Sequence, residues 1–181
     1  PNSRDRYYLM KYDVATGLSE RLTYGSHNVY LNDISPDGKK LLCSTSKPDI
    51  TRCPFSLSSL FEIDLTTLQA DTLVAWDAYL GSASYSPDGK QLLVTGSPSA
   101  FGGIGKNCGE HPIANAFDTQ AFIMDLATKK VQAITRDFNP TVSPVQWNRV
   151  DGCIYFDTTD GDCRHKYRYV TKAGGFEMLP L

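Results

Sequence analysis

The chain lacks long apolar runs and clusters of basic residues, and no signal peptide is visible in its first residues. None of its apolar runs approaches the roughly 18 to 20 residues that a membrane-spanning helix requires, so we expect no membrane span. Its 18 lysines and arginines stand against 20 acidic residues, a formal net charge of −2, and we therefore expect no nucleic-acid partner. The first residues, Pro1 to Arg6, are polar and contain no signal peptide.

The chain has few cysteines, and none forms a Cys-x-x-Cys pair, which argues against a zinc site. Cys43 and Cys53 are ten residues apart, as are Cys153 and Cys163. Two local disulfides, with Cys108 left over, are therefore one alternative. Buried free thiols are the other.

Sequence patterns for catalysis and for cofactor binding are also missing. No Gly-x-Ser-x-Gly segment occurs and no Ser, Asp and His set can be assigned, so we expect no catalytic residue in the chain. Gly102–Lys106 is followed by Asn107, whereas a phosphate-binding loop requires Ser or Thr after its lysine. Asp157–Asp162 lacks the closing Glu of a calcium loop. We expect no metal and no other cofactor, and enzymatic activity of the chain itself stays open.

Isolated histidines and tryptophans carry no pattern of a site. His27 and His165 stand alone near predicted strand ends, without a catalytic partner. Trp76 and Trp147 adjoin predicted innermost strands, and we interpret them as core residues rather than as platforms for a ligand.

One short motif, in contrast, occurs twice almost unchanged. Ser35–Leu42 is Ser-Pro-Asp-Gly-Lys-Lys-Leu-Leu, and Ser86–Leu93 is Ser-Pro-Asp-Gly-Lys-Gln-Leu-Leu. Ser-Pro-Asp-Gly is a turn sequence, because proline presets φ, aspartate bonds to the nearby backbone and glycine accepts a positive φ. The apolar pair that follows predicts a strand. Two copies that are 51 residues apart indicate a repeat.

A second motif keeps a constant distance from the first. The pattern Asp, aliphatic residue, any residue, Thr occurs at Asp13–Thr16, Asp64–Thr67 and Asp125–Thr128, each time after a strand-like segment. The step from its aspartate to the next turn glycine is 25 residues in the first two cases and 27 in the third, where Trp147–Gly152 takes the place of Ser-Pro-Asp-Gly. The chain therefore contains a third, degenerate copy of the turn.

These spacings predict an all-β fold, a partial β-propeller of about three and a half four-stranded antiparallel blades, because a blade spans about 40 to 50 residues. The predicted strands are residues 7–13 and 19–23, then 29–34, 40–45, 59–64 and 71–75, then 80–85, 91–95, 119–125 and 131–135, and finally 142–147, 153–158, 166–170 and 175–179. We expect one propeller fragment, 1–181, divided into a half blade at 1–25 and blades at 26–75, 76–136 and 137–181. A closed propeller needs about four to eight blades, so we expect a piece of a larger one that self-associates through its open faces and edges.

The loops between second and third strands are the better place for a site. Both repeated turns fall on one side of each predicted sheet and these loops fall on the other. The longest of them, Gly96–Asp118, lies on a rigid scaffold, where binding residues are common. Its candidate binding residues are Phe101, Lys106, Glu110 and His111. Glu110 and His111, an adjacent acid and imidazole, are candidates for contacting a cationic ligand or a partner, and ordinary solvated side chains are the alternative.

The repeated Ser-Pro-Asp-Gly-Lys-x-Leu-Leu motif resembles the WD40-like repeats of TolB-type propellers and of the N-terminal propeller of the prolyl oligopeptidase family of serine peptidases. The segments Gly96–Asn107, Asp118–Leu126 and Ile134–Phe138 are similar to dipeptidyl-peptidase IV-like members from Bacteroides-type bacteria. The repeat covers most of the chain but is shared by several propellers. The loop is the more specific part of the resemblance.

The resemblance implies a role in proteolysis for a parent protein, an exported serine-type peptidase of the periplasm or cell envelope. Its triad would lie in a hydrolase domain that this chain does not contain, and the propeller would gate or position short peptide substrates for that domain. The implied partners are the peptide, the hydrolase domain and the remaining blades. Dipeptidyl members hold the substrate's amino terminus with a Glu pair, which this sequence lacks, so Glu110 is a guess for that role. The alternative is a TolB-like propeller that acts as a protein-interaction module.

Overall fold

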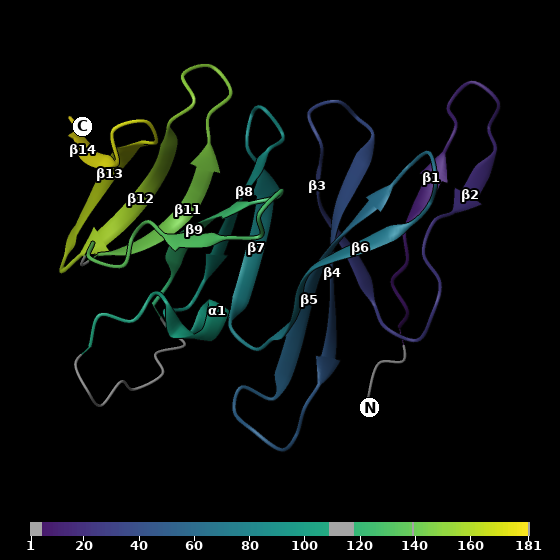
Figure 1. Ribbon diagram of the computed structural model, residues 1–181, viewed down its shortest axis with the longest axis horizontal. Helices are drawn as coiled ribbons and strands as arrows, with labels where there is room; N and C mark the ends of the chain where they lie inside the picture. Colours follow the sequence, from purple (N-terminus) through teal and green to yellow (C-terminus); the bar gives the residue numbers. More distant parts are fainter. Residues whose placement is uncertain (1–4, 109–117, 139, 181) are drawn as a thin grey trace. The chain divides into compact units, whose positions relative to one another are not determined.

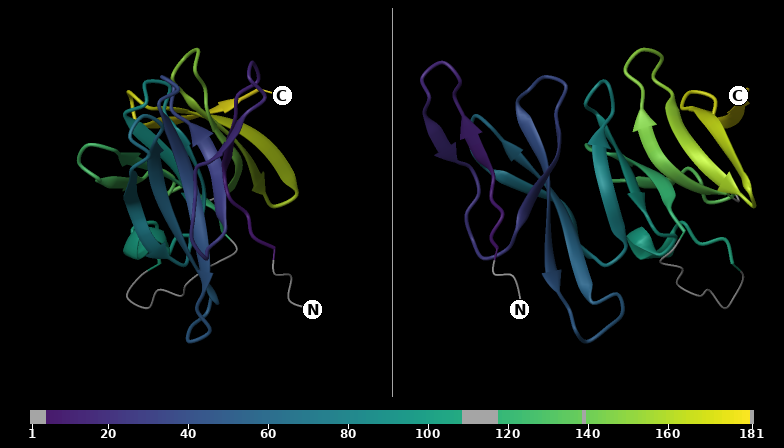
Figure 2. Two further views of the ribbon diagram at one scale, coloured as in Figure 1. Left: turned by 90° about the vertical axis from the view of Figure 1, so that its right-hand side faces the viewer. Right: turned by 180° about the vertical axis from the view of Figure 1, so that it is seen from behind.

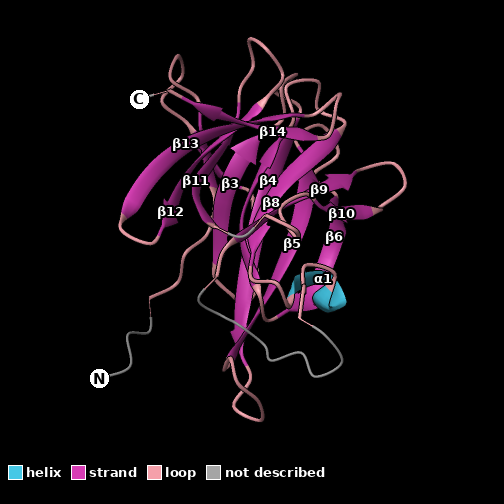
Figure 3. Cartoon of the chain, turned by 90° about the vertical axis from the view of Figure 1, so that its left-hand side faces the viewer, coloured by secondary structure: helices cyan, strands magenta, loops and turns pink. Residues whose placement is uncertain are grey.

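A computed structural model describes residues 5–108, 118–138 and 140–180 (Figure 1). The chain divides into two compact units, Pro1–Ala78 and Tyr79–Leu181. Each unit is described by itself below. The described residues are almost entirely strands, turns and loops, with one short helix (Figure 3).

The first unit contains a two-stranded and a four-stranded antiparallel sheet. The small sheet pairs β1 (Met10–Tyr12) with β2 (Ser19–Arg21). The larger sheet has the order β3-β4-β5-β6, and its strands are β3 (Val29–Ile34), β4 (Lys40–Pro48), β5 (Ser56–Asp64) and β6 (Ala70–Asp77). Neighbours in sequence are neighbours in the sheet, as in a propeller blade.

The second unit contains two four-stranded antiparallel sheets, again built from strands consecutive in sequence. The first consists of β7 (Leu80–Tyr85), β8 (Gln91–Gly96), β9 (Gln120–Asp125) and β10 (Val131–Ala133). The second consists of β11 (Thr141–Trp147), β12 (Ile154–Asp160), β13 (Cys163–Val170) and β14 (Gly175–Leu179). The short helix α1 (Ala100–Gly103) follows β8.

The predicted fold class is confirmed: the chain is an all-β partial propeller, with three four-stranded sheets and a two-stranded one. The division of one fragment into a half blade and three blades at these residues stays a prediction. Strands β4 and β5 are each three residues longer than predicted, and they pair as far as Lys47 opposite Leu57 and Pro48 opposite Ser56. The hairpin therefore extends beyond the predicted bounds at the end of the sheet opposite the Ser-Pro-Asp-Gly turn (Figure 2). The six added residues are three serines, a lysine, a proline and a leucine, a composition that does not predict a strand.

The repeated Ser-Pro-Asp-Gly turns have the same hydrogen bonds in both copies. Ser86 Oγ donates to Asp88 Oδ1 at 2.6 Å and accepts from the backbone N–H of Gln91 at 2.9 Å. Ser35 makes the corresponding bonds with Asp37 and Lys40 at 2.6 and 2.9 Å. The turn glycine adopts a φ of 70° in each copy, which favours glycine over residues with a side chain. Serine, aspartate and glycine are thus each required by the geometry of the turn.

The degenerate third copy closes over the same number of residues but differs inside the turn. The Asn148 N–H donates to the Cys153 carbonyl at 2.8 Å, as the Ser35 N–H does to the Lys40 carbonyl at 2.9 Å. Its positive-φ residue, Gly152, stands one position later in the turn than Gly38. Here Asn148 Oδ1 accepts from the N–H of Val150 at 2.7 Å, and the N–H of Cys153, which is equivalent to Lys40, donates to Asp151 Oδ1 at 3.0 Å instead of to the first residue of the turn.

The core of the second unit lies where its two sheets pack on each other. The buried residues of this cluster are Leu93, Ala121, Ile123, Ile134, Val142, Ile154, Phe156 and Tyr169. Phe138, from the connection between β10 and β11, packs against the same cluster, with its ring centroid 4.7 Å from that of Phe176 and 4.9 Å from that of Tyr167. Half-buried Trp147 also packs here, and its indole N–H donates to the Gly152 carbonyl at 3.0 Å. Its interpretation as a core residue is correct.

All five cysteines are free thiols. Cys153 lies just before β12, and Cys163 pairs with Asp160 at the other end of that strand. At about 3.3 Å per residue, the length of β12 keeps the two sulfurs far beyond disulfide reach. Cys43 is in the middle of β4, whereas Cys53 is in the loop beyond the end of that strand. The local-disulfide alternative is therefore wrong, and buried free thiols describe Cys43 and Cys153.

Candidate functional site

The sheets present a constant end and a variable end. At the constant end, the two repeated turns join first to second strands and third to fourth strands. The carboxylate of Asp64, for example, accepts from the N–H groups of Thr66 and Thr67 at 2.8 and 2.9 Å, and these bonds lower its pKa. The same arrangement lowers the pKa of Asp13 and of Asp125. These carboxylates accept hydrogen bonds within their own turns, so the candidate sites lie at the variable end.

The described part of the β8–β9 loop is tightly folded against its own sheet. Phe101 has a φ of 53°, and its ring centroid is 5.2 Å from that of Phe122, whose side chain is fully buried. The Gln120 side-chain amide donates to the Gly105 carbonyl at 2.9 Å. A Cβ on Gly105 would lie 2.3 Å from the Gln120 oxygen and 3.1 Å from the Phe122 ring. The glycine is therefore required for close packing.

Of the four predicted binding residues, the structure places Phe101 and Lys106. Phe101 is half-buried and contributes to packing against Phe122. Lys106 is half-buried, and its N–H donates to the Gly103 carbonyl at 3.1 Å. Glu110 and His111 lie outside the described residues. Ligand binding by this set of four stays a prediction.

A second feature of the variable end is a groove of about 430 Å³ in the second unit. It lies where β12 ends and β13 begins, beside the start of β11. Its lining residues are Ser143, Asp157, Thr158, Thr159, Arg164, His165 and Lys166. Antiparallel pairing places Asp157 opposite Lys166, Thr158 opposite His165 and Thr159 opposite Arg164. The sheet register therefore brings these residues together.

The groove combines hydrogen-bond donors and acceptors with little unbalanced charge. Lys166 Nζ lies 2.7 Å from Asp157 Oδ1, so these two charges are paired. Arg164 and His165 add donors, and Ser143 adds a hydroxyl. Within the described residues, no hydroxyl is hydrogen-bonded to a histidine ring, so the groove shows no assembled nucleophile and base. It is suited to holding a polar chain.

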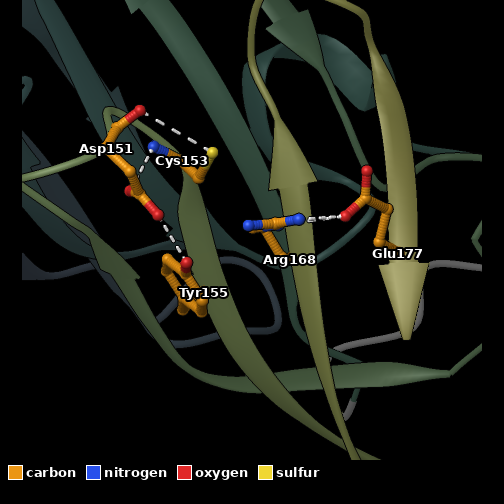
Figure 4. A network of polar contacts seen from close by, with 5 residues as sticks. All are labelled: Asp151, Cys153, Tyr155, Arg168 and Glu177. Carbon is orange, nitrogen blue, oxygen red and sulfur yellow. Dashed lines mark hydrogen bonds and ion pairs between the residues drawn. The ribbon is translucent and has the colours of Figure 1, made fainter. Parts of the chain in front are cut away.

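A polar network on the same sheet, towards its constant end, is a structural brace (Figure 4). Tyr155 Oη donates to Asp151 Oδ2 at 2.5 Å, and Asp151 Oδ1 accepts from the N–H of Cys153 at 3.0 Å. The bond to Asp151 raises the pKa of Tyr155, and the bonds from Tyr155 and Cys153 lower the pKa of Asp151. Arg168 pairs with Glu177 across β13 and β14, which raises the pKa of Arg168. These contacts fix the Asp151 turn to β12 and join β13 to β14.

Sequence reasoning missed the groove, although it singled out one of its segments. The sequence of Asp157–Asp162 favours a strand-ending Asp-Gly turn over a calcium loop, and in the structure β12 ends at Asp160 before a turn, with Asp157 paired with Lys166. His165 was interpreted as isolated, and the register places it beside Thr158 in the groove. A usable signal was the run of consecutive polar residues on each strand of this hairpin, Asp157–Asp160 and Arg164–Lys166. In the described part of the chain, no group of three His, Cys, Asp or Glu side chains is arranged to hold a metal, and no helix has the length and apolar character to span a membrane.

Comparison with known proteins shows similarity in fold. No protein-family model matches the chain, and no curated protein matches it. TolB from Acinetobacter baumannii superposes with a TM-score of 0.64 at 20% identity over 96% of this chain and 37% of its own length. An oligogalacturonate lyase from Vibrio parahaemolyticus has a TM-score of 0.69 at 16% identity over 97% of this chain and 49% of its own. The β-propeller domain of the Trilobed protease from Pyrococcus furiosus has a TM-score of 0.57 at 12% identity, over 85% and 43%.

These similarities support the propeller fold. The chain spans less than half the length of each of the three proteins.

Proposed function

We propose that the chain is a non-catalytic propeller segment of a larger serine peptidase of the prolyl oligopeptidase type, and that it positions short peptides for a hydrolase domain. The observation that carries the proposal is the groove at the variable end of β11, β12 and β13. Its mixed donors and acceptors match a peptide backbone, which offers one donor and one acceptor per residue. A volume of about 430 Å³ is within the range of small-ligand sites and suits a few residues of an extended peptide.

The finer parts of the proposal come from the sequence resemblance. We propose dipeptidyl specificity with Glu110 near the substrate's amino terminus, and an exported parent protein in the periplasm or cell envelope. The likeness to a protease propeller is compatible with these assignments.

The groove is tested by binding of an alanine tetrapeptide that carries fluorescein at its C-terminal end. We expect saturable binding, weakened about fivefold by Arg164→Gln, because one hydrogen bond from a charged donor contributes about 1 kcal/mol at an exposed site. Arg149→Gln is the matched control, since Arg149 is an exposed arginine in the turn at the constant end of the same sheet. Equal affinity of wild-type protein and Arg164→Gln would show that the groove does not hold the peptide.

The peptidase assignment is tested separately by the reading frame that follows Leu181. A downstream domain with a Gly-x-Ser-x-Gly segment supports the proposal, and a stop codon contradicts it. The purified chain should not hydrolyse peptidyl p-nitroanilides, and hydrolysis that survives repurification would contradict a non-catalytic role.

A TolB-like protein-interaction module is the second candidate. It is favoured by the match to TolB, which has the highest identity of the three comparisons and extends over 96% of this chain. The two candidates differ in the reading-frame test, because an interaction module needs no hydrolase domain.

A further inference from the structure

The first unit contains a separate pocket with a different chemistry. It lies at the variable end of β4 and β5, where their hairpin extends beyond the rest of the sheet, and encloses about 280 Å³. Three of its lining residues, Arg6, His27 and Lys47, come from segments far apart in the sequence. Ser46 and Ser56 add hydroxyls, and Phe55 adds an aromatic wall.

The ammonium group of Lys47 packs on the face of the Trp76 indole ring. Its Nζ lies 4.0 Å from the centroid of the Trp76 ring, and the His27 ring meets the same indole edge-on at 6.0 Å. Trp76 belongs to the outermost strand, β6, and has a φ of 48°. A left-handed backbone is costly for a residue with a large side chain and persists only where its surroundings impose it. Lys47 and His27 are therefore positioned on one indole before any ligand arrives.

The pocket carries positive charge with no opposite charge in its lining. Arg6 and Lys47 form no ion pair with another described residue, and no carboxylate lines the pocket. Asp49 is the acidic residue nearest to Lys47 in the sequence. It forms an ion pair with Arg52 at 3.0 Å and accepts a hydrogen bond from Thr51 Oγ1 at 2.5 Å. Asn28 Oδ1 accepts from the Tyr7 N–H at 3.0 Å, so its amide group remains as a further donor. A pocket lined by donors and cations selects an anion.

The Phe55 ring restricts the class of anion to one that carries an apolar group. Phe55 is 64% exposed at the edge of the pocket, a position from which its ring can cover an apolar group attached to the anion. A free phosphate has no such group, whereas the C-terminus of a peptide carries a carboxylate and a side chain on the same carbon. We propose that this pocket binds the C-terminal carboxylate of a peptide whose last residue is apolar. The choice of a peptide rests on the proposed function; the anion site itself does not.

The test uses a matched pair of probes on the full wild-type chain. N-acetyl-phenylalanine carries the carboxylate, and N-acetyl-phenylalanine amide has the same shape without the charge. Binding is followed by the indole N–H resonance of Trp76 in ¹H–¹⁵N NMR spectra, with Trp147, which lies in the other unit, as the internal reference. We expect the acid to shift the Trp76 resonance saturably, the amide to bind about tenfold more weakly or worse, and the Trp147 resonance to stay in place. Equal effects of acid and amide, or none from either, would overturn the proposal.

Variants then locate the contact. Lys47→Met keeps an unbranched stem over Trp76 and removes the ammonium, so it should weaken binding of the acid about tenfold. Lys39→Met removes the same charge from the turn at the constant end of the same sheet and should leave binding unchanged. Arg6→Gln, outside every strand, should weaken binding without affecting the sheet. If Lys47→Met and Lys39→Met lost affinity for the acid equally, the net charge of the protein would explain the loss, and the proposed site would be overturned.

Three further ligands distinguish the sources of the anion. Inorganic phosphate binding as tightly as N-acetyl-phenylalanine would exclude a role for Phe55 and overturn the proposal. If N-acetyl-aspartate amide bound as tightly as N-acetyl-phenylalanine, the pocket would recognise an acidic side chain, and the C-terminal assignment would be overturned. Binding of an oligogalacturonate in place of the peptide acid would overturn it as well. A negative result here leaves the tetrapeptide experiment on the β11–β13 groove unaffected, so the two proposals fail separately.

Discussion

Replacing Ser86 by alanine tests whether the repeated turn is held by its serine. The Ser86 side chain is 2% exposed, and its oxygen both donates to Asp88 and accepts from the backbone N–H of Gln91. Alanine removes both bonds and leaves the Gln91 N–H without its partner at the start of β8. A donor that loses its partner in a buried site costs about 1 to 3 kcal/mol. The bond to the more exposed Asp88 carboxylate adds less, because solvent screens it. We expect the free energy of unfolding to fall by about 2 kcal/mol.

The assay is urea unfolding of the full chain, followed by the indole resonance of Trp147, which reports on the unit that contains Ser86. The midpoint should fall with an unchanged m-value, because the surface exposed on unfolding stays the same. Ser82→Ala is the matched control: this exposed serine only shares a bond of 2.9 Å with Thr95, so its removal should change stability by less than about 0.5 kcal/mol.

The same variant has a predicted pH signature. The Ser86 hydroxyl is the main cause of the lowered pKa of Asp88, and the Lys90 N–H is the second. A carboxyl group with a depressed pKa in the folded state stabilises the protein above its unfolded pKa, and this stabilisation is lost as the pH falls through the folded value. The wild-type chain should therefore lose more stability than Ser86→Ala on acidification below about pH 4. Equal stability of Ser86→Ala and wild-type protein at neutral pH, or an equal loss in Ser82→Ala, would refute the hydrogen-bond argument.

Four other predictions follow from the packing. Lys129→Gly should stabilise the β9–β10 turn by about 0.5 kcal/mol, because Lys129 has a φ of 59°; Gly174→Ala, at the equivalent turn with a φ of 70°, should destabilise by about 1 kcal/mol, and thermal unfolding checks both signs. Phe138→Ala should lower the free energy of unfolding by about 3 kcal/mol, because the ring packs within the aromatic cluster of the second unit; a loss below about 1 kcal/mol in urea would contradict this. Burial raises the pKa of the Cys43 thiol to about 12, so iodoacetamide should modify exposed Cys53 and spare Cys43 until the chain unfolds, as mass spectrometry can show. Self-association through open sheet edges should appear as a mass above 20.0 kDa in light scattering at high concentration, and a monomer at every concentration would contradict it.

Most strand positions could be predicted because the turns that end them are local. Each Ser-Pro-Asp-Gly turn satisfies its serine, aspartate and glycine within six residues, and each Asp-x-x-Thr turn within five. The strand ends predicted less well are those without such a turn. The distal β4–β5 hairpin is one, because its alternating serines form strands only through pairing across the hairpin.

The two candidate sites depend on contacts that no local pattern encodes. Asp157 and Lys166 meet because the register of β12 and β13 places them opposite each other, and a shift of one residue would put them on different faces. Lys47 and Trp76 are 29 positions apart in the chain, and their contact depends on the length of β4 and on the bend of β6. Trp147 packs against the core as predicted, whereas Trp76 packs against Lys47 and His27, a contact that no local pattern predicts.

The sequence by itself determined the repeat, its turns and the class of fold, because turn chemistry acts over a few residues and recurs at constant distance. Only the tertiary structure decided that the cysteines are free, that Phe101 packs inward, and that separate polar segments form a groove and a pocket. Those outcomes depend on strand register and on the packing of sheets, which are set by interactions between residues distant in the chain.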